Sequence, residues 1–171
     1  WSLGRYPDGG PFWYGLTPRT RDAANAAPPA RVIISEINYH PPDFIADTNL
    51  IDNSLDEFVE LRNESAGPVT FHNTNGTWRI NGGVTFTFPT NFTLAAGEHI
   101  LLVSFNPIFS VQSNAFRTLY GITNPAQRIF GPYVGKLANN SDRLALELPQ
   151  HPDGTNAQVS WVVVDEVLYA D

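Results

Sequence analysis

The chain has 171 residues, of which 42% are hydrophobic and 16% charged, a balance typical of one globular domain with an appendage. Its 17 acidic and 10 basic residues give a formal charge of -7, which disfavours binding to nucleic-acid phosphates. No apolar run is long enough for a transmembrane helix, and a single lysine, Lys136, argues against a polybasic membrane patch. Without cysteine, the chain has neither disulfides nor thiolate metal ligands.

Residues 1–30 differ in composition from the rest of the chain. Frequent glycine and proline between Gly4 and Pro18 exclude a long regular element, and an Ala/Pro run precedes residue 31. Disordered linkers contain few aromatic residues, so we expect the aromatic side chains of this segment to pack against a surface. We predict an irregular N-terminal arm or linker over residues 1–30 with the following candidate interaction residues: Trp1, Tyr6, Phe12, Trp13 and Tyr14.

From residue 31 onward, short apolar runs are separated by turn residues. Residues 32–42 and 56–63 alternate apolar and polar side chains, which places one face of a strand in a core. Repeated short strands of this kind indicate a sandwich or a barrel. We therefore predict one all-β, immunoglobulin-like β-sandwich over residues 31–171, with strands near 31–39, 56–62, 67–72, 77–81, 84–88, 98–104, 142–148 and 159–169.

One segment near 107–120 has helical signals. Asn106 suits an N-cap and Pro107 suits the first helical position. Because Ser113 and Asn114 can restart the cap, we expect two short helical turns instead of one straight helix. This helical insertion is expected to cover one end of the sandwich.

Three glutamates, Glu36, Glu57 and Glu60, stand among apolar residues of the first two predicted strands. Carboxylates at neighbouring strand ends can bind calcium, and with Asp56 these residues form a candidate calcium site. The same glutamates, as an acid/base pair, provide the support for a hydrolase. The alternative is a structural role, in which each glutamate accepts hydrogen bonds from loop amides or pairs with an arginine.

The segment Pro41–Leu55 forms a long acidic loop between these two strands, with Asp43, Asp47 and Asp52. Loops of this length are often functional, and scattered carboxylates suit a hard cation. Their spacing does not follow an EF-hand and the loop has no glycine. We favour a solvated loop, with a second calcium site as the alternative.

Zinc and nucleophilic chemistry have no motif in this chain. The four histidines lie in separate regions and no Gly-x-Ser-x-Gly sequence occurs. A carbohydrate-binding module would need exposed aromatic rings. Trp78 and Trp161 lie in predicted strands and are expected in the core, which leaves the aromatic residues of the arm for such a role.

Several segments follow the two opening strands in an ordered series: Gly76–Ile80, Phe86–Pro89, Leu94–Val103, Phe116–Gly121, Gly131–Tyr133, Leu137–Leu144 and Val164–Tyr169. In this order they resemble the lamin-tail domain of exported bacterial proteins, over about residues 31–171. The head of the chain, with Gly4–Gly9 and Leu16–Pro18, resembles the end of a preceding module in such proteins.

The resemblance implies a non-enzymatic structural or interaction module of a larger exported bacterial protein, outside the cell or on its surface. Such a module serves protein–protein contact, adhesion or assembly, so the expected partners are proteins or neighbouring modules. We expect no nucleic-acid partner, no membrane insertion and no cofactor apart from the calcium candidate. A carbohydrate-binding module that binds a glycan is the alternative, followed by a carboxylate hydrolase. Because the chain opens on Trp1 and not on methionine, we also expect a piece of a longer protein.

Overall fold

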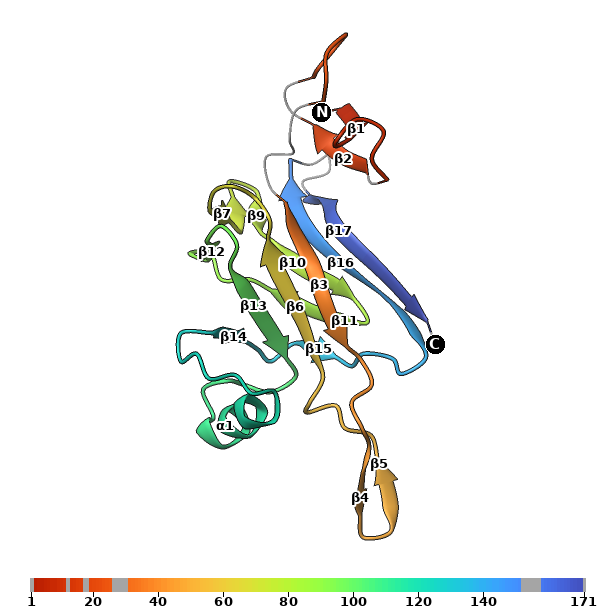
Figure 1. Cartoon of the computed structure of the whole chain (residues 1–171), viewed down its shortest axis with the longest axis vertical. Coiled ribbons are helices and arrows are strands. Elements are labelled where there is room, and N and C mark those ends of the chain that lie inside the picture. Colours follow the sequence, from red (N-terminus) through yellow and green to blue (C-terminus); the bar gives the residue numbers. More distant parts are fainter. Residues whose placement is uncertain (1, 12, 17–18, 26–30, 152–157, 171) are drawn as a thin grey trace.

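A computed structural model describes residues 2–11, 13–16, 19–25, 31–151 and 158–170, and for residues 14 and 15 it describes only the backbone. Two β-sheets pack face to face, with one short helix at one end and a separate small hairpin at the N-terminus (Figure 1). The predicted all-β sandwich is thus confirmed.

The first sheet has four strands in the order β14-β13-β6-β3. β6 pairs antiparallel with both β3 and β13, whereas β13 and β14 are parallel because a crossover containing the helix connects them. β3 is an edge strand, and its register with β6 shifts between Ile34 and Glu36, which bends the strand locally. The strands are β3 (Val32–Asn38), β6 (Phe58–Asn63), β13 (His99–Val103) and β14 (Arg128–Phe130).

The second sheet has five antiparallel strands in the order β15-β11-β10-β16-β17. β17 is its long edge strand, on the same side of the sandwich as β3 (Figure 1). The register between β16 and β17 shifts between Leu146 and Glu147. The strands are β10 (Arg79–Gly82), β11 (Val84–Thr87), β15 (Val134–Gly135), β16 (Ser141–Gln150) and β17 (Ser160–Ala170).

The inner faces of the two sheets meet in one apolar core. Alternate residues of each strand enter it, such as Val59 and Leu61 of β6 and Leu144 and Leu146 of β16, which are fully buried. Burial of each such side chain stabilises the fold by about 1.5–3 kcal/mol. A cluster of rings in edge and stacked contacts fills one end of the core: Phe71, Trp78, Phe88 and Phe92.

Helix α1 (Ser110–Leu119) packs on the outer face of the four-stranded sheet through Phe116. Its apolar partners there include Leu101 and Val103, so β13 is buried on both faces and its sequence is apolar without alternation. The predicted pair of short turns is wrong: a single helix forms over Ser110–Leu119, and its buried residue Phe116 attaches it to the sheet. It begins at Ser110 and not at Pro107, since the Oδ1 of Asn106 instead accepts a hydrogen bond from the Ile108 amide at 3.1 Å.

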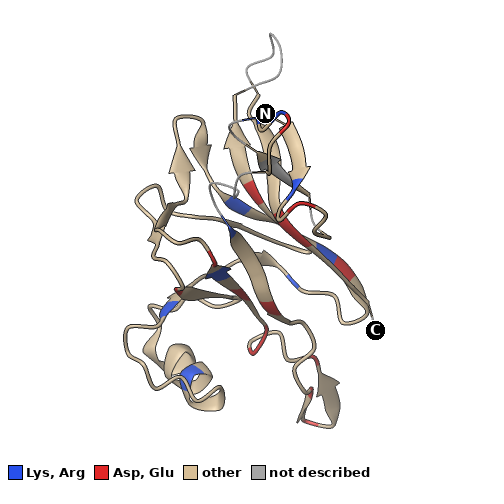
Figure 2. Cartoon of the chain, turned by 45° about the horizontal axis from the view of Figure 1, so that its top comes forward, with Lys and Arg blue, Asp and Glu red and all other residues tan. Residues whose placement is uncertain are grey.

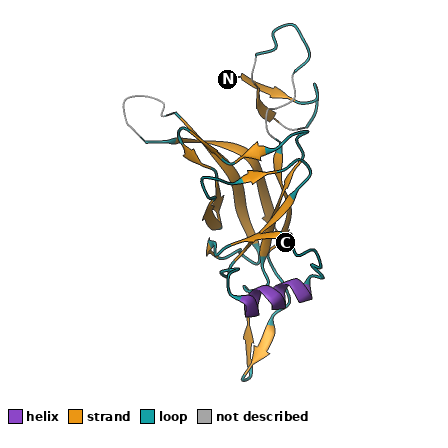
Figure 3. Ribbon diagram, turned by 90° about the vertical axis from the view of Figure 1, so that its left-hand side faces the viewer, coloured by secondary structure: helices purple, strands orange, loops and turns teal. Residues whose placement is uncertain are grey.

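The acidic segment 41–55 contains a hairpin where the sequence predicted a solvated loop. β4 (Phe44–Ala46) pairs with β5 (Asn49–Ile51) through a two-residue turn. Asp47 and Thr48 have φ of 53° and 92°, the left-handed region that such turns require. The hairpin projects beyond the sandwich at the end where α1 lies (Figures 1 and 3). Two further short pairs are β7 (Val69–Thr70) with β12 (Thr93–Leu94) and β8 (His72–Asn73) with β9 (Gly76–Thr77).

The N-terminal arm is more ordered than its composition predicted. β1 (Ser2–Arg5) and β2 (Trp13–Leu16) form an antiparallel hairpin, and the amide side chain of Asn25 donates to the Arg5 carbonyl at 3.0 Å. Gly4 leaves room for the buried Leu16 side chain, because a Cβ at position 4 would lie 2.3 Å from the Leu16 Cδ1 atom and that side chain would have to move. The predicted irregular arm is thus corrected to a small folded hairpin.

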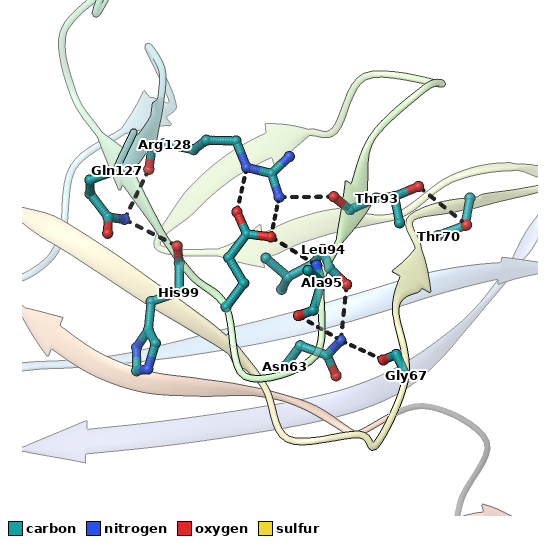
Figure 4. Close-up of polar contacts among 10 residues, drawn as sticks. Asn63, Gly67, Thr70, Thr93, Leu94, Ala95, His99, Gln127 and Arg128 are labelled. Atoms are coloured by element: carbon teal, nitrogen blue, oxygen red, sulfur yellow. Dashed lines mark hydrogen bonds and ion pairs between the residues drawn. The ribbon is translucent and has the colours of Figure 1, made fainter. Parts of the chain in front are cut away.

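A buried asparagine holds two turns together at the end of the four-stranded sheet (Figure 4). Asn63 is fully buried, and its side-chain amide donates to the carbonyl oxygens of Gly67, Leu94 and Ala95 at 2.9–3.0 Å. The carboxylate of Glu98 accepts from the Ala95 amide and from the guanidinium of Arg128. These contacts fix the turns that lead into β13.

Candidate functional site

A groove of about 510 Å³ lies on the open side of the sandwich, between the edge strands β3 and β17. Apolar side chains of both edges line it, among them Val32, Ile34, Val163 and Val167. Trp13 of the N-terminal hairpin lines it as well. An apolar concave surface with a few polar groups is the usual form of a binding site.

Asp165 connects the two edges of this groove. Its Oδ2 atom accepts a hydrogen bond from the Ile34 backbone amide at 2.7 Å. Burial raises the pKa of the Asp165 carboxyl, and the Ile34 hydrogen bond acts in the opposite direction. An inward-pointing carboxylate on an edge strand also discourages pairing with a further strand.

The other charges beside the groove already have partners. Arg31 pairs with Glu64 at 2.8 Å, and Arg143 Nε donates to Glu166 at 2.8 Å. The described residues that line the groove include no Ser, Cys, His or Lys. Because no free acid/base pair or nucleophile faces the groove, its geometry suits binding of apolar side chains better than catalysis.

The four residues of the candidate calcium site are not brought together. Glu57 is fully buried on the inner side of the sheet, where its Oε2 atom accepts from the Tyr133 hydroxyl at 2.9 Å and the Leu137 amide at 3.2 Å. Glu60 lies on the outer side, where its Oε1 atom accepts from Ser35 at 2.6 Å. Residues three apart in a strand face opposite sides of the sheet, so Glu57 and Glu60 cannot share one cation.

Of the remaining two carboxylates of the candidate site, Glu36 is a neighbour of Glu60 and Asp56 lies apart. Glu36 is exposed opposite Glu60 on the neighbouring strand, and Asp56 accepts from the Asn53 side chain at 2.6 Å. His99 Nδ1 lies 3.0 Å from Glu60 Oε1, a contact that the sequence did not indicate. Among the described residues, no group of three or more Asp, Glu or His side chains could hold a metal ion. The four residues of the predicted calcium site are therefore not assembled: Glu36 and Glu60 are cross-strand neighbours, whereas Asp56 and Glu57 lie elsewhere.

The candidate aromatic residues of the arm lie in different places. Trp13 lines the groove and is 62% exposed, with the Arg5 guanidinium 5.0 Å from its ring centroid. Tyr6 is partly buried in the connection between β1 and β2. Trp1, Phe12 and the side chain of Tyr14 lie outside the described residues.

The strand tryptophans do not form a sugar-binding platform. Trp78 is buried in the core, as predicted. Trp161 is not in the core: it is half-buried, and the Arg79 guanidinium, held by Glu147 at 2.7 Å, lies 3.7 Å from its ring centroid. Since a cation already stacks on this ring, one of its faces is closed to a sugar.

The β4–β5 hairpin is a functional candidate that the sequence reading missed. Ile45 and Leu50 are 76% and 69% exposed, although both are large and apolar. Adjacent apolar pairs, Phe44–Ile45 and Leu50–Ile51, flank the Asp-Thr turn, and adjacent apolar residues in a strand face opposite sides. That pattern was the available signal for a hairpin that is apolar on both faces.

No helix among the described residues is long and apolar enough to cross a membrane. No protein-family model and no curated protein matches this chain.

Proposed function

We propose that this chain is a non-enzymatic structural module of the lamin-tail type, which belongs to a larger exported bacterial protein and contacts neighbouring modules or other proteins. The observation that carries this proposal is the position of Trp13 in the groove between β3 and β17. An aromatic side chain from outside the sandwich thus lies against its open side. A tail of one module that docks on the next would make this type of contact.

The surroundings of the groove favour a contact function over catalysis. Its carboxylates are used by Ile34, Arg31 and Arg143. Of the glutamates of the hydrolase alternative, Glu57 is buried on the inner side of the sheet. Glu36 and Glu60 are cross-strand neighbours on the outer face, where Glu60 already contacts Ser35 and His99. The cation above Trp161 disfavours the carbohydrate-binding alternative. Exported location and a role in adhesion or assembly follow from the family resemblance and remain part of the proposal.

The test uses the arm and the sandwich as separate molecules. A synthetic peptide of residues 1–30 is titrated into a chain that begins at Arg31, with peptide fluorescence anisotropy as the readout. We expect saturable binding that Trp13→Ala weakens roughly tenfold, because this ring provides apolar contact area to the groove.

The matched control is Leu3→Ala, which removes another exposed apolar residue of the same hairpin. We expect this peptide to bind like the wild-type peptide, since Leu3 does not line the groove. Size-exclusion chromatography with light scattering on the full chain shows whether the arm acts within one molecule or between molecules. Two results together would contradict a docking role. The peptide would not bind the chain that begins at Arg31, and NMR relaxation would show that the arm of the full chain is as mobile as the free peptide.

A further inference from the structure

The β4–β5 hairpin, Phe44–Ile51, is called the finger below. It presents apolar side chains on both faces, because Phe44 lies opposite Ile51 and Ile45 lies opposite Leu50. Their exposed fractions are 46%, 38%, 76% and 69%, respectively. An isolated two-stranded hairpin is marginally stable in water and gains stability when a surface covers it. These side chains belong to neither core cluster, so folding of the sandwich does not require them.

Further large apolar residues are exposed at the start of α1, at the same end of the molecule as the finger. Ile108, Phe109 and Val111, at the start of α1, are 83%, 59% and 78% exposed. The finger and α1 lie at the same end of the sandwich, opposite the N-terminal hairpin (Figures 1 and 3). Large apolar residues gathered at one end of a protein mark a contact surface.

The finger carries negative charge only. Asp47 is exposed in its turn and Asp43 precedes its first strand, whereas Asp52, which follows its second strand, is already paired with Lys136. No Lys or Arg occurs between Arg31 and Arg62, and Figure 2 accordingly has red but no blue positions on the finger. A partner surface with lysine or arginine around an apolar centre is complementary to this pattern.

A second copy of this chain does not provide such a surface. In the described residues from 31 to 170, every Lys and Arg already contacts an acceptor of its own chain. The contacts are Arg31 and Arg62 with Glu64, Arg79 with Glu147, Arg117 with the Asn124 and Gln127 carbonyls, Arg128 with Glu98, Lys136 with Asp52, and Arg143 with Glu166. Self-association through the finger would therefore bring its carboxylates to a sandwich whose cations are already paired. In the described part of the arm, Arg21 pairs with Asp22 and Arg5 stacks on Trp13, which leaves Arg19 as a single cation and not a basic border around an apolar centre.

A lipid bilayer is also unsuitable for the finger. The two outer edges of a two-stranded hairpin present unpaired backbone groups, which are costly in hydrocarbon. The carboxylates of the finger are repelled by anionic headgroups. Protein, which can supply both hydrogen bonds and cations, meets both requirements.

We propose that the finger docks on an apolar surface of another protein that is bordered by lysine and arginine. This contact is separate from the groove that Trp13 lines, so either site can fail without the other. The acidic residues select the partner and accelerate association, and the four apolar side chains supply the affinity.

The experiment uses the 171-residue chain and two matched helical peptides as probes. One peptide is an amphipathic helix of leucine and lysine, and the other has glutamate in place of every lysine. Binding is measured by fluorescence anisotropy for the wild type, for Ile45→Ser/Leu50→Ser, and for Leu168→Ser. Leu168 is 72% exposed on β17, outside the finger, and serves as the control for loss of an exposed leucine. Circular dichroism and thermal unfolding check that all variants fold.

We expect the lysine peptide to bind the wild type and Leu168→Ser equally, and to bind the finger variant roughly tenfold more weakly. Binding should weaken in about 0.5 M NaCl, and the glutamate peptide should not bind. Equal binding of the two peptides, or unchanged binding to the finger variant, would overturn the proposal. Two other results would also overturn it. If the wild type dimerises and the finger variant does not, the finger binds a second copy of the chain. If the wild type floats with phosphatidylcholine vesicles and the finger variant does not, the finger binds a membrane.

Discussion

Glu57 and Glu60 belong to the same short stretch of sequence, yet their surroundings differ. Glu57 is fully buried and holds the 133–137 segment through Tyr133 and Leu137, whereas Glu60 lies on the outer face with Ser35 and His99. Burial raises the pKa of the Glu57 carboxyl, while its hydrogen bonds act in the opposite direction. A buried glutamate with two donors is a structural group that anchors a loop.

The pH dependence of stability tests this role of Glu57. Its pKa is higher in the folded than in the unfolded chain, so its contribution to stability is fully present below the unfolded pKa and is lost as the pH rises through the folded pKa. We expect the unfolding free energy of the wild type, relative to Glu57→Gln, to fall as the pH rises above the ordinary pKa of a glutamate. Urea denaturation at a series of pH values measures this difference.

Glu36→Gln is the control, because Glu36 is exposed. Its unfolding free energy is measured over the same pH range, as the reference for removal of an exposed carboxylate from the same sheet. If the unfolding free energy of Glu57→Gln had the same pH dependence as that of the wild type, the prediction would be contradicted. Urea denaturation of the same proteins with and without calcium tests for a calcium site. If calcium raises the urea midpoint of the wild type but not that of Glu57→Gln, Glu57 is a calcium ligand after all.

At the scale of elements, α1 is held to the sandwich by one apolar and one polar contact. Phe116 packs against Phe58, Leu101, Val103 and Phe105 of the sheet and the segment that follows it. The Tyr120 hydroxyl, just after the helix, donates to the Asp56 carbonyl at 2.7 Å and accepts from the Asn38 side chain at 2.6 Å. This hydroxyl joins the helix to the segments on both sides of the finger.

Tyr120→Phe should therefore loosen this end of the molecule. The substitution removes the hydroxyl's two hydrogen bonds, while the Asn38 amide keeps its own bond to the Asp56 carbonyl at 3.1 Å, so we expect a loss of about 0.5–1.5 kcal/mol in unfolding free energy. Hydrogen–deuterium exchange should become faster in residues 53–56 and 110–119. Leu119→Ala, an exposed position in the same helix, should change exchange much less, and equal effects of both substitutions would refute a specific role of the hydroxyl.

At the scale of the whole molecule, the sandwich and the N-terminal hairpin are separate units. Both core clusters consist of residues after position 31, whereas Leu16 is buried within the arm. Trp13 lies against the groove but remains largely exposed. The sandwich therefore contains all the apolar contacts of its own core.

A chain that begins at Arg31 should fold with one cooperative transition, and its unfolding free energy should lie within about 1 kcal/mol of that of the full chain. The arm adds only a partly exposed contact, so its loss removes little buried apolar area. Guanidinium denaturation monitored by circular dichroism measures both chains. A transition that broadens or disappears would mean that the arm completes the core.

The sequence alone determined the class of fold and most of its strands. Alternation in β3 and β6 and turn residues between short strands were sufficient, because a period of two follows from backbone geometry and does not depend on the rest of the molecule. The burial of Trp78 and the presence of a helix before β14 were also predictable. The same alternation already places Glu57 and Glu60 on opposite faces of the sheet. A calcium site that includes both residues is therefore excluded by the sequence pattern alone.

Only the tertiary structure decided which edges and surfaces remain free. The groove exists because β3 and β17, far apart in sequence, are both edge strands on one side of the sandwich. Trp161 lies under Arg79 because strand pairing brings β10, β16 and β17 together, which a local pattern does not encode. The finger is exposed because no described segment of the chain covers its apolar side chains. The sequence does not show this, because an apolar run looks the same whether it packs within its own chain or against another protein.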